Sequence, residues 1–169
     1  EQGWFVTGNR ALLSPSLTER TLREHLTPEQ WTLGAWLGQR FGGGLNRLAS
    51  VLRLPLGPLR KVRPQQWEGA RSCNLAVWRR DLDRIDGFDC AYEGWGREDS
   101  DLLVRLLHAG VRRKDGVFAT GVLHLWHPTA DRSWLPDNDR RLDDVRVGGR
   151  VIAERGMSTM RDMAMPVPA

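Results

Sequence analysis

Alternation between strand-like and helix-like patterns over residues 72–127 constrains the fold of this 169-residue chain more than any other feature. An apolar run at 72–78 predicts a strand, and the charged segment 79–85 predicts a short helix that ends at an Asp-Gly turn. Leucine spacing predicts a longer helix over 98–110. Residues 117–127 are rich in β-branched and aromatic side chains and predict a further strand, ended by proline. These patterns indicate the α/β class.

The first 40 residues repeat this order of strand and helix. Residues 3–9 form a short apolar run bounded by turn formers, which predicts a core strand. Ser14 followed by a proline predicts a helix start, with the helix over 16–26, and the capping-box spacing from Thr27 predicts a second helix. Because the chain opens with Glu1 directly before a core strand, we expect it to begin inside a larger protein.

Residues 31–63 contain no acidic side chain, and their arginines are interleaved with apolar residues. Basic amphipathic segments of this kind bind membrane surfaces or anionic polymers. The same pattern is typical of a helical hairpin with a solvated basic face, broken here at the glycines 42–44 and at Pro55. Both interpretations stay open at this point.

Charge, apolar runs and cysteine spacing limit the class of protein and the expected compartment. The chain carries 25 Lys and Arg against 21 Asp and Glu, a net charge of +4. It has no apolar run long enough to span a bilayer and no basic-then-apolar leader. Cys73 and Cys90 lack C-x-x-C spacing, so a reducing cytoplasm is the expected compartment.

Gly94-Trp95-Gly96-Arg97-Glu98-Asp99-Ser100-Asp101 is the strongest candidate for chemistry. It places three carboxylates at the predicted start of a helix, where free N–H groups and the helix dipole orient negative charge. The glycines permit a close approach by a ligand, and the indole of Trp95 offers a face for a sugar ring. Asp101 has an alternative role as an ordinary first-turn helix cap.

Several linked segments together resemble the C-terminal half of inverting GT-A glycosyltransferases, and most closely the galactosyltransferase C-terminal module of bacterial family 2 enzymes. The segments are Ser72-Cys73-Asn74-Leu75-Ala76-Val77-Trp78, Ile85-Asp86-Gly87-Phe88-Asp89, Tyr92-Glu93-Gly94-Trp95-Gly96-Arg97-Glu98-Asp99-Ser100-Asp101-Leu102 and Arg105-Leu106. The resemblance implies part of a GT-A fold with a mixed sheet and flanking helices. Residues 65–135 would form the catalytic region, after a strand and basic helical segment over 1–64 and before a terminal helix, expected from about Pro136, and flexible tail over 136–169.

The resemblance also implies roles for individual residues. Asp99 corresponds to the catalytic base, with Glu98 beside it supporting acceptor binding. The implied substrate-binding residues are Trp95, Gly94, Gly96, Asn74 and Asp101. Ser100 stands where animal relatives carry an aspartate.

A metal site is implied at His127, with His124 as a second candidate ligand. On a strand, residues three apart point to opposite faces, so we expect one imidazole to enter the site unless the chain turns before Pro128. The implied ion is Mn²⁺ or Mg²⁺. Neither Asp81-Leu82-Asp83 nor Asp99-Ser100-Asp101 follows an apolar strand, so we expect the family's Asp-x-Asp motif to lie upstream of Glu1.

The function implied is transfer of a sugar from a nucleotide-sugar, expected to be a UDP-sugar, to a hydroxyl of a glycan or lipid-linked acceptor in polysaccharide biosynthesis. Residues 129–138 are expected to form a lid. The expected location is the cytoplasm, at the inner face of the plasma membrane through residues 31–63, with no nucleic acid partner. The alternative is a non-catalytic, Trp-rich basic module, and the isolated chain is expected to be inactive.

Overall fold

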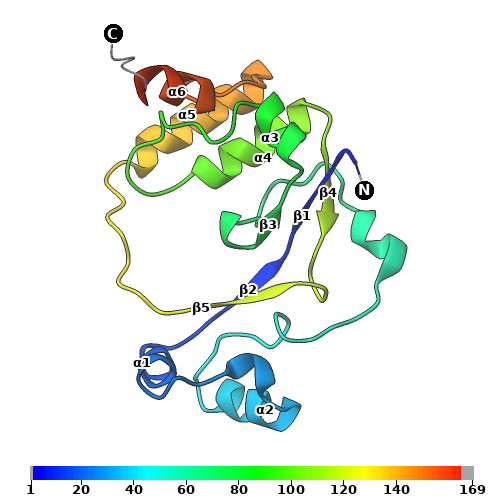
Figure 1. The fold of residues 1–169 in the computed structure, drawn as a ribbon, viewed down its shortest axis with the longest axis vertical. Helices are drawn as coiled ribbons and strands as arrows, with labels where there is room; N and C mark the ends of the chain where they lie inside the picture. The colour runs from blue at the N-terminus through cyan, green and yellow to red at the C-terminus, as the bar shows by residue number, and fades with distance from the viewer. Residues whose placement is uncertain (1, 165–169) are drawn as a thin grey trace.

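The computed structural model describes residues 2–164, which form two small sheets flanked by helices at both ends (Figure 1). The strands are β1 (Trp4–Thr7), β2 (Asn9–Leu12), β3 (Leu75–Ala76), β4 (Arg112–Asp115) and β5 (Gly121–His124). The α-helices are α1 (Pro15–Arg23), α2 (Leu33–Phe41), α3 (Arg79–Arg84), α4 (Glu98–His108), α5 (Leu135–Gly148) and α6 (Met157–Ala164). Three short 3₁₀ turns are η1 (Pro28–Gln30), η2 (Gly57–Lys61) and η3 (Ser72–Asn74). This mixed α/β arrangement is compatible with a glycosyltransferase domain.

One extended segment near the N-terminus links the two sheets. The predicted strand over 3–9 continues to Leu12 and is divided at Gly8 into β1 and β2. A Cβ at Gly8 would lie 2.2 Å from both the Asn74 amide and the Thr120 hydroxyl, so only glycine fits where the segment passes from one sheet to the other.

The larger sheet has the order β3-β1-β4, with β1 antiparallel to β3 and parallel to β4. The smaller sheet pairs β2 with β5 in parallel, with Leu12 opposite His124. Strand β4 has no apolar alternation and was not predicted. Its backbone pairs with β1, and the Arg112 guanidinium carbon lies 4.8 Å above the Trp4 ring, so charged side chains cover an apolar one.

The main core lies between the larger sheet and α4. Phe5 from β1, Ile85 after α3, and Leu102 and Leu106 from α4 are all fully buried. Helix α5 packs on α4 through Val104 and Val145. Figure 1 shows α3, α4, α5 and α6 gathered at the same end of the molecule, with α1 and α2 at the other. The predicted helices over 79–85 and 98–110 are confirmed as α3 and α4. The core between α4 and the larger sheet holds α4 in place.

The basic segment 31–63 is not a helical hairpin. It contains α2, then irregular chain, then η2, because glycines and Pro55 interrupt helical hydrogen bonding. The cap of α2 is Thr32, whose Oγ1 accepts a hydrogen bond from Ala35, whereas Thr27 makes no cap and its predicted capping box is wrong. The ring centres of Trp31 and Trp36 lie 5.0 Å apart. Phe41 is the most exposed aromatic side chain of the segment. The membrane contact of residues 31–63 stays a prediction.

Helix starts elsewhere follow the sequence pattern. Ser14 Oγ accepts a hydrogen bond from Leu17 N and caps α1, as predicted. The last predicted helix, from about Pro136, is α5. Part of the predicted flexible tail forms α6, and residues 165–169 lie outside the described residues. Among residues 2–164, no helix has the length and hydropathy that a bilayer crossing requires.

Candidate active site

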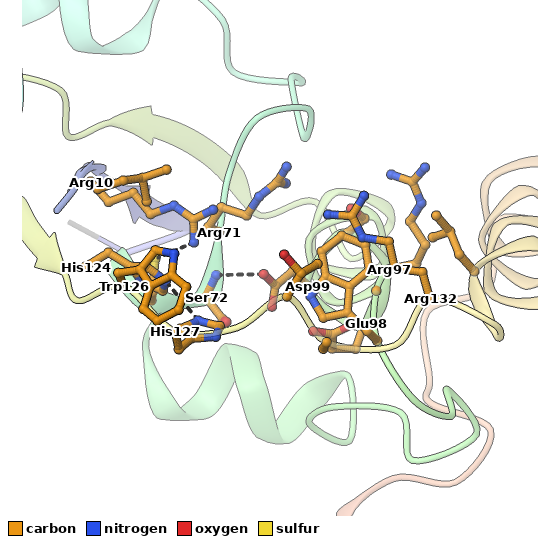
Figure 2. A pocket seen from close by; sticks show the side chains of 18 of the residues that line it. Arg10, Arg71, Ser72, Arg97, Glu98, Asp99, His124, Trp126, His127 and Arg132 are labelled. Carbon is orange, nitrogen blue, oxygen red and sulfur yellow. Dashed lines mark hydrogen bonds between the residues drawn. The ribbon is translucent and has the colours of Figure 1, made fainter. Parts of the chain in front are cut away.

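A cavity of about 590 Å³ lies where the start of α4, the end of β5 and η3 meet. The turn before α4 contributes Trp95, Gly96 and Arg97, and the first turn of α4 contributes Glu98, Asp99 and Ser100. The chain around η3 contributes Arg71, Ser72 and Cys73, and β2 contributes Arg10. His124, Trp126 and His127 complete the opposite wall (Figure 2). Segments far apart in sequence therefore share one hollow.

A strained turn sets the position of the acidic residues. Gly94 and Gly96 have φ angles of +63° and +106°, and Arg97 adopts the left-handed region at +80°. A Cβ on Gly94 would lie 2.8 Å from the Trp134 ring, and one on Gly96 would lie 3.1 Å from Leu135. Arg97 forms an ion pair with Asp139 of α5. The strain at Arg97 is thus held by contacts with α5.

Asp99 is half-buried and faces the cavity from the first turn of α4. Its Oδ2 accepts a hydrogen bond of 3.1 Å from the backbone N–H of Ser72. Its Oδ1 is shielded from solvent and has no hydrogen-bond partner within residues 2–164, and the same holds for Glu98 Oε2. One carboxylate oxygen of Asp99 is therefore held by the backbone, and the other is buried without a partner in the described chain.

Asp101 lies on the other side of α4, away from the cavity. It is fully buried and forms an ion pair of 2.7 Å with Arg105, which in turn donates hydrogen bonds to the carbonyls of Ile85 and Gly87. Burial raises the pKa of the Asp101 carboxyl, and the Arg105 guanidinium opposes that rise. Asp101 thus anchors α4 to the chain after α3, and neither its predicted ligand contact nor a simple cap role describes this position.

Two other predicted ligand-binding residues also lie outside the cavity lining. Asn74 donates a hydrogen bond of 2.8 Å from Nδ2 to the carbonyl of Asn9, which ties η3 to β2. Gly94 packs under Trp134 instead of facing the cavity. Both residues position the wall of the site.

Trp95 lines the cavity with 43% of its surface exposed. The guanidinium carbon of Arg132 lies 4.5 Å from the centre of its ring. The indole face therefore carries a cation from the loop after β5.

His124 and His127 both line the cavity, and their Nε2 atoms are 3.2 Å apart. Of the two alternatives, the one with a turn before Pro128 holds, since the strand ends at His124 and the His127 ring lies beside that of His124. His127 Nδ1 lies 2.9 Å from the carbonyl of Pro128. Burial, the Arg10 charge and His127 lower the pKa of His124, which favours its neutral, ligand-competent form.

The donor set fits part of a metal site. Two imidazole nitrogens bound to one zinc ion at about 2.0–2.1 Å each lie roughly 3 Å apart, close to the separation of the two imidazole nitrogens here. Within residues 2–164, no group of three or more His, Cys, Asp or Glu side chains could hold a metal ion. The two histidines would thus need oxygen ligands from elsewhere.

Arg10 and Arg71 were missed by the sequence analysis. Arg10 is brought beside His124 by the parallel pairing of β2 with β5, and its NH1 lies 3.9 Å from the Cys73 sulfur. Arg71 donates a hydrogen bond to the carbonyl of Ala70. Neither forms an ion pair with a carboxylate in the part of the chain that the structure describes. No local pattern marks these residues, because their position depends on strand pairing.

A family model described as the N-terminal domain of galactosyltransferase matches residues 60–127. This segment runs from η2 to His127 and includes Trp95, Glu98 and Asp99. The match supports a glycosyltransferase-like module and glycosyl transfer at a general level. Its description names an N-terminal domain, whereas the resemblance in the sequence was to a C-terminal half. No solved structure matches the chain.

Proposed function

We propose that this chain provides the acceptor-activating residues of an inverting glycosyltransferase of GT-A type that uses a UDP-sugar donor. The observation that carries the proposal is the Asp99 carboxylate, oriented by Ser72 N–H inside a cavity shared with Trp95 and His127. A carboxylate held in this way can take a proton from a bound hydroxyl.

In the proposed reaction, Asp99 accepts the proton of an acceptor hydroxyl as that oxygen bonds to the anomeric carbon of the donor. The bond from the anomeric carbon to the diphosphate oxygen breaks, and the nucleoside diphosphate leaves with the electron pair. A single displacement inverts the anomeric configuration. Glu98 holds the acceptor, and the part of the Trp95 ring that Arg132 does not cover provides an apolar surface for a sugar.

Positive charge in the cavity supports departure of the diphosphate. Arg10 and Arg71 lie on the same side of Asp99 as His124 and His127 (Figure 2). Guanidinium groups bind phosphate oxygens through paired N–H donors, so these arginines would neutralise charge on the leaving group. His127 and His124 would hold a Mn²⁺ or Mg²⁺ ion, which when bound supplies further charge neutralisation at phosphate oxygens.

The test is turnover by the full-length protein supplied with UDP-sugars and a panel of glycan and lipid-linked acceptors. Release of UDP and the anomeric configuration of the product are measured by NMR. The proposal predicts a product of inverted configuration relative to the donor. A product of retained configuration would contradict it. So would UDP release and sugar transfer that stay unchanged when Asp99 is replaced by Asn.

A further inference from the structure

Cations outnumber acids on the cavity wall. The lining includes the four arginines Arg10, Arg71, Arg97 and Arg132, against the carboxylates of Glu98 and Asp99. Arg97 is paired with Asp139. Within residues 2–164, Arg10, Arg71 and Arg132 have no carboxylate at ion-pair distance. The cavity therefore carries more positive charge than its own acids neutralise.

These cations form two groups on opposite sides of the catalytic carboxylate. In Figure 2, Arg10 and Arg71 lie beside the histidines, whereas Arg97 and Arg132 lie beyond Asp99 and Glu98. One nucleoside diphosphate can occupy only one of these groups. In the second group Arg97 is already paired with Asp139, so Arg132 is the cation on that side with no carboxylate partner within residues 2–164.

The direction of attack decides which pair of arginines faces the donor and which faces the acceptor. In a single displacement, the attacking hydroxyl approaches the anomeric carbon opposite to the departing diphosphate. The acceptor must also contact Asp99, which takes its proton. If the diphosphate lies at Arg10 and Arg71, the acceptor lies on the side of Arg97 and Arg132.

Arg132 lies where it could contact a charged group on that acceptor. Its guanidinium carbon lies 4.5 Å from the centre of the Trp95 ring, and its N–H groups make no protein hydrogen bond within residues 2–164. A sugar ring near Trp95 would meet these N–H groups. Guanidinium N–H pairs match carboxylate and phosphate oxygens.

We propose that the acceptor is an anionic sugar, bearing a carboxylate or a phosphate, and that Arg132 recognises its charge. This inference rests on the proposed function, since it takes Asp99 as the base and the histidine side as the donor side. Glu98 lies near the same group and would repel an anion placed against it, so the anion is expected at Arg132 and the hydroxyl at Glu98 and Asp99.

The test measures binding of three sugars to the protein by calorimetry in the presence of UDP. Methyl β-glucuronide carries a carboxylate, N-acetylglucosamine 6-phosphate carries a phosphate, and methyl β-glucoside is neutral. At least one anionic sugar is expected to bind about tenfold more tightly than the neutral one, since hydrogen bonds to charged groups are the stronger ones. Comparison of the two anionic sugars tells which anion is preferred.

Substitutions identify the residue that causes the preference for anionic sugars. Arg132→Gln is expected to reduce the preference for the anionic sugar to about twofold or less, and Arg132→Lys to retain part of it. Arg161→Gln, on exposed α6 and away from the cavity, is the matched control and should leave the preference unchanged. Equal binding of all three sugars would overturn the inference. So would a preference that survives Arg132→Gln and is lost in Arg10→Gln or Arg71→Gln, because the anion would then occupy the donor side.

The two proposals fail in different ways. If the anionic preference is absent while Asp99→Asn still abolishes inverting transfer, the acceptor inference is wrong and the proposed function stands. If the Arg132-dependent preference is present and the protein transfers sugar with retention, the proposed mechanism is wrong and the chain holds an anionic-sugar site of another kind.

Discussion

The backbone N–H of Ser72 donates a 3.1 Å hydrogen bond to Oδ2 of Asp99, joining residues 27 positions apart in the chain. This contact couples η3 to the first turn of α4. Because η3 is itself tied to β2 through Asn74, the carboxylate is oriented by the junction of the two sheets. The geometry of Asp99 therefore depends on the fold around it as well as on the turn that precedes it.

Loss of the buried carboxylate of Asp101 should strongly destabilise the fold. Asp101→Ala leaves the fully buried Arg105 guanidinium without its counter-charge, which typically costs about 3–5 kcal/mol. Urea unfolding followed by circular dichroism measures this. Asp143→Ala, which breaks an exposed pair with Arg146, is the control and should cost less than about 1 kcal/mol. Similar losses from both variants would contradict the anchoring role of Asp101.

Acid should weaken the attachment of the chain before α6. Burial acts to raise the pKa of Asp89, but N–H donors from Glu154, Ala91 and Arg155, together with the Arg150 charge, hold it below its ordinary value of 3.8. A carboxyl whose pKa is lower in the folded state contributes stability above the unfolded value and loses it as pH falls through the folded value.

The free energy of unfolding, measured from pH 7 down to pH 2, tests this contribution. Wild-type protein should exceed Asp89→Asn by about 1–3 kcal/mol at pH 7, the cost of disrupting charged hydrogen bonds. The difference should shrink below about pH 3.8. A difference that stays constant across the whole range would show that ionisation of Asp89 does not stabilise the fold.

The loop between β5 and α5 is expected to close over the cavity when the donor binds. Only part of the predicted lid 129–138 is loop, because α5 begins at Leu135 and Asn138 is buried with a hydrogen bond to the Glu93 carbonyl. The remaining residues 129–134 are exposed, and Thr129, Ala130 and Arg132 line one edge of the cavity. We therefore restrict the lid to 129–134.

Trypsin provides a direct probe, since Arg132 lies within this loop. Saturating UDP with Mn²⁺ should slow cleavage after Arg132 several-fold, because loop closure removes the exposed site. Cleavage after Arg23, at the far end of the molecule, serves as the internal control. Unchanged cleavage after Arg132 under conditions where calorimetry detects bound UDP would rule out a donor-induced lid.

Local features of the site could be predicted from the sequence, and non-local ones could not. The start of α4 at Glu98 follows from glycines and first-turn acids within a few residues. Asp101 was predicted either to contact the ligand or to cap the helix, whereas its spacing of four from Arg105 and its place beside Leu102 indicate the buried face of the helix. That signal could have placed it correctly.

Strand pairing determines most of the features that could not be predicted from the sequence. Strand β4 is charged throughout and has no period-two pattern, so it forms because β1 offers hydrogen bonds and Trp4 offers an apolar face. The approach of Arg10 to His124 depends on the parallel pairing of β2 with β5, which joins segments more than 100 residues apart. Nothing within either segment indicates that partner.

The effect of Asp99→Asn on turnover by the full-length protein tests the central claim most directly. Asparagine keeps the shape of the side chain and can still accept the Ser72 hydrogen bond, but it cannot take the acceptor proton. We expect kcat to fall by roughly 10²–10⁴, with the KM for the UDP-sugar little changed. Asp83→Asn, at an exposed position of α3, is the control and should leave kcat unaffected. Near-wild-type kcat in Asp99→Asn would contradict the assignment of Asp99 as the base.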